Sequence, residues 1–261
     1  MLIHLDDIRL NVTLTGPVAG PPLVLLHALG TTMGLWDDLL PLLPPSLWVL
    51  RVDLRGHGGS DAPAPPYAMG ALIRDVERVM QHVGMTGAVV VGCSLGGLVA
   101  QGLAIKRLDL VRAMVLSNSA VRIGTAELWS RRAEEVRRDS LAAYAPGAML
   151  RMFGPQGQAH PALPRVRDML TATLPGGWIG CAMAIAGTDF YAPTAALTLP
   201  TLVIAGARDA TTPPDLVRET ADLISGSQFA LIQRAGHLPM VDQPAEFATL
   251  LDAFLTRIGH I

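Results

Sequence analysis

The chain has 261 residues, of which 50% are hydrophobic, and a formal net charge of −2 at pH 7. This length suits one globular unit with a sizeable core, and the weak charge with its scattered basic residues argues against a nucleic-acid partner. The first ten residues contain Asp6, Asp7 and Arg9, and no apolar run reaches roughly 18 residues, so we expect no secretory leader, no membrane segment and a cytoplasmic location. Two cysteines, Cys93 and Cys181, give no disulfide framework.

The hydrophobic pattern predicts strands alternating with helices. Residues 8–16 alternate apolar and polar side chains, which is typical of a strand with one wet face, and we expect this strand at a sheet edge. Continuous apolar runs, typical of strands covered on both faces, follow at 23–28, 48–54, 87–92, 111–117, 199–206 and 229–236. Helical spacing occurs at 69–83, ending at Gly84, and again at 213–226 and 243–259. This order predicts an α/β fold with a mostly parallel sheet.

One long segment contains no strand-like run. Residues 120–196 instead carry helix-forming stretches interrupted by "FGPQGQAHPALP" and "TLPGGW". Because an insertion of this size between two strands is too long for a plain loop, we expect a helical cap at 120–196 on a core domain of residues 1–119 and 197–261.

A serine follows the strand at 87–92 and precedes a helix. Gly92, Cys93, Ser94, Leu95 and Gly96 fit G-x-S-x-G, in which a tight turn between strand and helix exposes the serine hydroxyl. The same turn points the Leu95 amide, at the helix N-terminus, toward an oxyanion. A plain turn would explain the pentapeptide alone, but its place between a buried strand and a helix favours a nucleophile.

Two later strand ends supply the partners that a serine nucleophile needs. Asp209 follows the run at 199–206, and His237 follows the run at 229–236. A hydroxyl is a poor nucleophile until a base takes its proton, and the base needs a partner to fix its tautomer. The sequence therefore predicts a Ser94, Asp209, His237 triad.

The loop after residues 23–28 is expected to supply a second oxyanion donor, for which Leu29 is the best candidate by position. His27 and His57 lie at a strand end and in a glycine-flanked turn, and we assign both a structural role. Cys93 is expected to be a small buried residue rather than a reactive thiol.

Four segments together resemble the α/β-hydrolase superfamily: the serine turn, "VDLRGHGGSD" at 52–61, "TLVIAGARDATTPP" at 201–214 and "AGHLPMVDQPAEF" at 235–247. The resemblance implies an eight-stranded sheet with helices on both faces and a cap after the sixth strand. A narrower resemblance, to the 3-oxoadipate enol-lactonases of aromatic catabolism, is carried by "LGTTMGLW" at 29–36, "SNSAVRIGTAELW" at 117–129 and "CAMAIAGTDF" at 181–190. It implies hydrolysis of a small lactone or ester with no cofactor. The sequence has no ligand cluster such as H-E-x-x-H, so we expect no metal.

Other functions remain open from the sequence. The same three residue types serve carboxylesterases on aryl or alkyl esters, cofactor-free haloperoxidases and carbon–carbon bond hydrolases, and a receptor could use the pocket only to bind. For substrate binding we name Arg122, the first charged residue of the cap, and Trp129. Arg122 could bind a substrate carboxylate, or could pair with an acid such as Glu127 and anchor the cap. Trp129, like Trp178, could line an apolar pocket or pack the cap onto the sheet.

Overall fold

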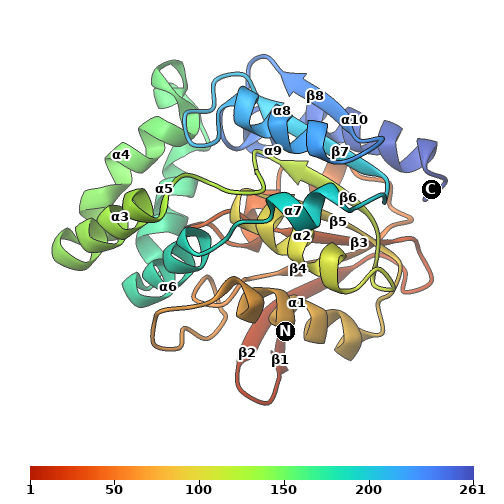
Figure 1. The fold of residues 1–261 in the computed structure, drawn as a ribbon, viewed down its shortest axis with the longest axis horizontal. Helices are drawn as coiled ribbons and strands as arrows, with labels where there is room; N and C mark the ends of the chain where they lie inside the picture. The colour runs from red at the N-terminus through yellow and green to blue at the C-terminus, as the bar shows by residue number, and fades with distance from the viewer.

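The computed structural model describes residues 1–261, and its centre is one eight-stranded sheet (Figure 1). The strands are β1 (Leu2–His4), β2 (Arg9–Thr15), β3 (Pro22–Leu26), β4 (Trp48–Val52), β5 (Ala88–Cys93), β6 (Val111–Ser117), β7 (Thr201–Gly206) and β8 (Gln228–Ile232). Their order is β1-β2-β4-β3-β5-β6-β7-β8. Pairing is antiparallel from β1 to β4 and parallel from there on, so the expected mostly parallel sheet is confirmed.

The expected edge position of the strand at 8–16 is wrong. This strand is β2, and it pairs on one side with β4 and on the other with β1, which is the true edge. Three residues are too few to show a strand pattern in the sequence, which is why β1 could not be predicted. The alternation itself has the expected effect, since Leu10 and Val12 are buried while Arg9 is exposed.

Helices cover both faces of the sheet (Figure 1). In this view α1 (Met69–Val83), α2 (Leu95–Lys106) and α8 (Pro214–Leu223) lie in front of the strands and α10 (Pro244–Arg257) lies behind them. Behind the sheet, α10 packs near the short helices η1 (Met33–Trp36), η2 (Leu40–Leu42) and α9 (Pro239–Asp242). There the rings of Trp36 and Phe247 meet with centroids 6.2 Å apart. The helix α1 ends as expected at Gly84, whose φ of 73° suits glycine.

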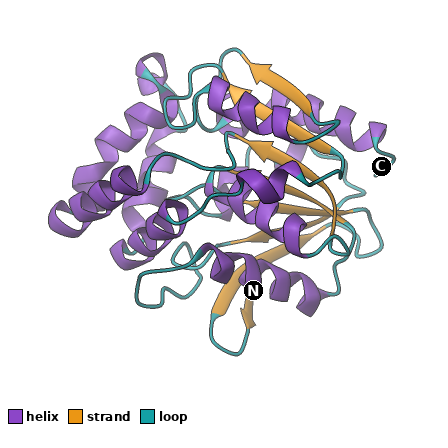
Figure 2. Cartoon of the chain, in the orientation of Figure 1, coloured by secondary structure: helices purple, strands orange, loops and turns teal.

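The chain between β6 and β7 is helical, and we call residues 120–196 the cap segment. It contains α3 (Ala126–Asp139), α4 (Leu141–Phe153), η3 (Pro155–Ala159), α5 (Leu163–Ala172), α6 (Pro175–Ala186) and α7 (Tyr191–Ala195). Figure 2 shows α3 to α6 gathered beyond the carboxyl ends of the parallel strands, and α7 contacts α2 and α8. The division into a core domain and a cap at residues 120 and 196 stays a prediction.

No single helix is long and apolar enough to cross a bilayer. The helices α5 and α6 meet the length and composition only as a pair, and they are bent by 97° at the break between them.

Candidate active site

Ser94 stands in a strained turn between β5 and α2. Its φ of 54° and ψ of −113° lie outside the regions that L-residues normally occupy. A Cβ on Gly92 would lie 2.2 Å from the Gly96 carbonyl oxygen, and a Cβ on Gly96 would lie 2.3 Å from the Leu26 oxygen. Only glycine fits at these two positions, which explains the G-x-S-x-G spacing physically.

Asp209 lies in the turn after β7, where several donors hold its carboxylate. The backbone amides of Thr211 and Thr212 donate to Oδ1 at 2.7 and 3.1 Å. The side chains of Asn118 and Thr212 donate to Oδ2 at 2.7 and 2.6 Å. Asn118 follows β6 with a φ of 47°, so a strained strand end aims it at the carboxylate. No sequence pattern marked Asn118 or Thr212 for this place.

His237 completes this group from the loop after β8. Its Nδ1 lies 2.8 Å from Oδ2 of Asp209, and its backbone N–H donates to the Met152 carbonyl of the cap segment at 2.7 Å. Burial alone would raise the pKa of Asp209, but the charge of His237 and the hydrogen bonds from His237, Asn118 and Thr212 outweigh it and lower that pKa. Asp209 is therefore held as a carboxylate, which can accept a hydrogen bond from Nδ1–H of His237.

Ser94 and His237 line one cavity between the carboxyl ends of the strands and the cap segment. Its walls are mostly apolar, with a few polar groups converging on one region, as in small-molecule sites. The lining residues are Leu29, Ser94, Trp129, Arg132, Tyr144, Ala148, Arg151, Met152, Leu170, Trp178, Thr211 and His237.

Two backbone amides can serve as oxyanion donors. Leu95 is the first residue of α2, so its N–H has no carbonyl one turn earlier in the helix to bind. Leu29 lines the cavity, and the next amide along, that of Gly30, donates to Nε2 of His57 at 2.9 Å. His57 thus braces the loop that carries Leu29.

His27 and His57 both have the geometry of structural histidines. Nε2 of His27 accepts from the Leu54 amide at 2.9 Å, and its Nδ1 donates to the Ala28 carbonyl at 2.8 Å. Burial lowers the pKa of His57 to about 3, with a further contribution from the neighbouring His27. Neither histidine lines the cavity.

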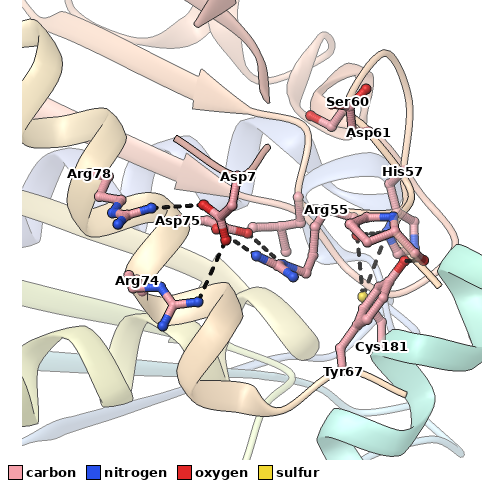
Figure 3. Close-up of polar contacts among 12 residues, drawn as sticks. Asp7, Arg55, His57, Ser60, Asp61, Tyr67, Arg74, Asp75, Arg78 and Cys181 are labelled. Atoms are coloured by element: carbon pink, nitrogen blue, oxygen red, sulfur yellow. Dashed lines mark hydrogen bonds and ion pairs between the residues drawn. The ribbon is translucent and has the colours of Figure 1, made fainter. Parts of the chain in front are cut away.

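A buried ion pair anchors the loop that carries Arg55 and His57 (Figure 3). The Arg55 guanidinium donates to both carboxylate oxygens of Asp75 on α1, at 2.6 and 2.8 Å, and lies over the Tyr67 ring. From α6, the Cys181 thiol donates to the Arg55 carbonyl at 3.4 Å and lies 4.0 Å from Nδ1 of His57. The cap segment therefore contacts the loop of Arg55 and His57 directly, and that loop in turn supports the Leu29 loop of the cavity.

Trp129 and Arg122, named from the sequence, occupy different surroundings. Trp129 is buried, lines the cavity, and its Nε1 donates to the Ile123 carbonyl at 2.5 Å. The Arg122 side chain is 50% exposed, lies 3.8 Å from Asp189 and is not part of the cavity wall. This position gives no support to substrate binding by Arg122, and its partner is Asp189 rather than Glu127.

Four polar residues of the wall were not predicted from the sequence, namely Arg132, Tyr144, Arg151 and Thr211. Thr211 lies in the turn after β7. Arg132, Tyr144 and Arg151 come from α3 and α4, where no motif marks them. Cys93 is buried, and its pKa is raised well above the ordinary value by burial. The structure contains no cluster of three or more His, Cys, Asp or Glu side chains that could hold a metal ion.

Known proteins share this fold. A family model described as "alpha/beta hydrolase fold" matches residues 21–244. The chain belongs to the α/β-hydrolase family. The fold expected for this hydrolase, including the eight-stranded sheet and the helical insertion after the sixth strand, is confirmed.

The relatives of this α/β hydrolase include enol-lactonases and esterases. It is 31% identical to 3-oxoadipate enol-lactonase 2 of Acinetobacter baylyi, over 97% of this chain and 96% of that protein. It is 30% identical to a pimeloyl-[acyl-carrier protein] methyl ester esterase of Neisseria meningitidis, over 93% and 96% of the two chains. The crystal structure of the enol-lactonase from Burkholderia xenovorans LB400 matches with a TM-score of 0.95 and 30% identity, over 98% of this chain and 100% of that one. The resemblance to 3-oxoadipate enol-lactonases is thereby confirmed.

Proposed function

We propose that this hydrolase cleaves a small lactone or ester through an acyl-enzyme intermediate, with Ser94 as nucleophile, His237 as base and Asp209 as its orienting acid. The observation that carries the proposal is that Ser94 and His237 line one cavity while Asp209 binds Nδ1 of His237. Since Nδ1 is engaged, Nε2 is the nitrogen left to take a proton from the Ser94 hydroxyl.

The first half-reaction forms the acyl-enzyme. The Ser94 Oγ attacks the carbonyl carbon while His237 removes the hydroxyl proton, and the amides of Leu29 and Leu95 stabilise the oxyanion. The C–O bond of the substrate then breaks, and His237 returns the proton to the departing oxygen. In a lactone that oxygen stays attached to the acyl group, because cleavage opens a ring.

The second half-reaction releases the acid. A water molecule gives a proton to His237 and attacks the Ser94 ester, and collapse of the tetrahedral intermediate returns the proton to the Ser94 oxygen. Every proton transfer uses His237, so the protons and bonds of both half-reactions balance without a metal or cofactor.

Among substrates we favour an enol-lactone of the 3-oxoadipate type, which would place the enzyme in aromatic catabolism. The support is the 31% identity to an enol-lactonase over nearly the whole chain. The second candidate is a carboxylesterase acting on small aryl or alkyl esters, supported by the similarity to the methyl ester esterase. Both candidates use the same acyl-enzyme chemistry, and they differ in the group that the cavity accepts.

The decisive variant for the mechanism is Ser94→Ala. We expect it to fold normally and to lower kcat by roughly 10⁴-fold or more, because no acyl-enzyme can form. A fluorophosphonate should add one adduct to the wild-type protein, measured by intact mass, and none to Ser94→Ala. The control is Ser119→Ala, since Ser119 is a buried serine whose hydroxyl donates to the Ser94 carbonyl at 2.8 Å. This control should keep the adduct. Activity of Ser94→Ala within tenfold of wild type would refute the mechanism.

The substrate candidates are separated by steady-state kinetics on a panel. An enol-lactone, a p-nitrophenyl ester and a β-diketone should be compared by kcat/KM at one pH. We expect the enol-lactone to give the highest value. A p-nitrophenyl ester that exceeds it tenfold would favour the esterase, and turnover of the β-diketone alone would indicate carbon–carbon bond hydrolysis.

A further inference from the structure

Two arginines from the cap segment face the cavity that holds Ser94 and His237. Arg132 comes from α3 and Arg151 from α4, and both belong to the cavity wall. The other lining residues are apolar, aromatic or uncharged polar groups apart from His237. The cap therefore contributes two positive charges to a site whose chemistry comes from the core.

Neither arginine forms an ion pair with an acid of the protein. No Asp or Glu forms an ion pair with Arg132 or Arg151, whereas Arg137 and Arg138 on the same helix α3 pair with Glu134 and Asp139. Nη2 of Arg151 is buried without any hydrogen-bond partner. A buried donor of this kind is costly to leave unpaired, so its presence in a ligand cavity points to a ligand acceptor.

Aromatic rings hold both guanidinium groups. Cζ of Arg132 lies 4.8 Å from the centroid of the Trp129 ring, and Cζ of Arg151 lies 5.0 Å from that of Tyr144. A cation–π contact positions a guanidinium without requiring a hydrogen bond from its N–H groups. The rings thus preorganise two forked donors for binding a planar anion.

The two charges also disfavour each other. Burial lowers the pKa of Arg132, and the positive charge of Arg151 adds to that lowering. Tyr144 and Glu135 act in the opposite direction without reversing it. An anion between them would relieve both the desolvation and the repulsion, and a carboxylate matches the fork geometry of arginine.

We propose that Arg132 and Arg151 together bind a free carboxylate of the substrate, at the end remote from the carbonyl that Ser94 attacks. This inference rests on the proposed function and narrows it to lactones or esters that carry a second, ionised carboxyl group. It assigns to Arg132 and Arg151 the role that the sequence suggested for Arg122.

A matched pair of esters tests the inference. Mono-p-nitrophenyl glutarate and p-nitrophenyl methyl glutarate have the same leaving group and differ only in whether the distal carboxylate is free. Wild-type enzyme should show a kcat/KM at least about tenfold higher for the acid. Arg132→Gln and Arg151→Gln should each lower kcat/KM for the acid by about 10- to 100-fold, the loss expected for a charge-assisted hydrogen bond, and should leave the methyl ester within about threefold.

Arg138→Gln is the matched control, because it removes one positive charge from the same helix at a residue paired with Asp139 outside the cavity. It should change neither ester by more than about twofold. Should Arg151→Gln fail to fold, Arg151→Lys keeps the charge without the fork and should still lower kcat/KM for the acid selectively. The inference would be overturned if wild-type kcat/KM for the acid did not exceed that for the methyl ester. It would also be overturned if the variants lost kcat/KM equally on both esters.

Binding of glutarate separates this inference from the proposed function, since it requires no turnover. Calorimetric titration of glutarate into the wild-type protein should give a Kd at least about tenfold lower than in Arg132→Gln or Arg151→Gln. If neither ester is hydrolysed but glutarate binds in this way, the proposed function fails and the carboxylate site stands. If both esters are hydrolysed and glutarate binding ignores the arginines, the hydrolase stands and the carboxylate site fails.

Discussion

The two sides of the cavity are built in different ways. One side is the carboxyl ends of the strands, which we call the sheet edge, and the other is the helices of the cap segment, which we call the cap wall. At the sheet edge, Ser94, Asp209 and His237 each follow a strand, and glycines and backbone hydrogen bonds fix their positions. In the cap wall, Arg132 and Arg151 come from helices, and their guanidinium groups contact aromatic rings. The edge is specified mainly by the backbone, and the wall mainly by pairs of side chains.

This difference assigns separate tasks to the two regions. A backbone-fixed constellation suits chemistry, which tolerates little displacement of the reacting groups. A wall made of side-chain pairs on inserted helices can change its charge and shape without disturbing the strands. We therefore expect substitutions at the edge to alter turnover of every substrate, and substitutions in the wall to alter the choice among substrates.

The strongest way to test the edge is to remove its acid. Asp209→Asn keeps the shape of the side chain but allows His237 to adopt the wrong tautomer, so kcat should fall by about 10³- to 10⁴-fold with little change in KM. Steady-state kinetics on acidic and neutral esters should show the same loss for both.

The control for this variant is a second carboxylate close to His237. Oδ2 of Asp242 accepts from the Gly236 amide at 2.6 Å, and an Asn at position 242 can still accept that bond through its amide oxygen. Asp242→Asn should therefore stay within about tenfold of wild type. The assignment of the acid would be wrong if Asp242→Asn cost more kcat than Asp209→Asn.

The residues of the edge could be predicted from the sequence because the fold imposes a pattern there. The glycines around Ser94 are required by close backbone contacts, and strand ends before Asp209 and His237 can be recognised as apolar runs. Asn118 lacked such a signal. Its role depends on a φ of 47° after β6 that turns the side chain toward Asp209, and no local pattern indicates that backbone conformation.

The cap wall could not be predicted in the same way. Arg132 lies in the run "RRAEEVRR" at 131–138, which in sequence is typical of a solvated helix face. The packing of α3 against α6 and α4 decides which side of α3 faces inward. These are tertiary contacts, which the local sequence does not indicate. Arg122 is the first charged residue of the cap segment, but its side chain lies near Asp189 at the surface. Position along the chain was a poor guide to position around the cavity.

A pair of glycine substitutions sharpens the claim that the edge is fixed by the backbone. Gly96→Ala would bring a Cβ within 2.3 Å of the Leu26 carbonyl oxygen, so we expect the free energy of unfolding to fall by at least about 3 kcal/mol. Gly70 lies exposed in α1, where an added Cβ would meet no other atom within 4 Å, and Gly70→Ala should raise the free energy of unfolding by about 0.4–1 kcal/mol. Urea titration measures both. A tolerated Gly96→Ala would contradict the tight-turn explanation.

The smallest expected loss of stability concerns His57, where the edge and the cap segment meet. Its Nε2 accepts from the Gly30 amide, and Cys181 of α6 lies against its Nδ1. The pKa of His57 is lowered from 6.5 to about 3, so between these values the unfolded chain binds a proton that the folded protein does not. The contribution of His57 to the free energy of unfolding therefore falls on acidification, by about 1.4 kcal/mol per pH unit below 6.5.

His57→Gln removes that titration while keeping an acceptor for the Gly30 amide. The variant should be less stable than wild type at pH 7, and the difference should shrink by about 2 kcal/mol at pH 5, because only the wild type loses stability through this proton. Urea titrations at the two pH values give the four free energies required. His82→Gln, at an exposed position on α1, serves as the control and should show an equal difference at both. A His57→Gln difference that is the same at pH 7 and pH 5 would mean that His57 takes up a proton in the folded protein, and His57 could then not brace the Leu29 loop as a neutral acceptor.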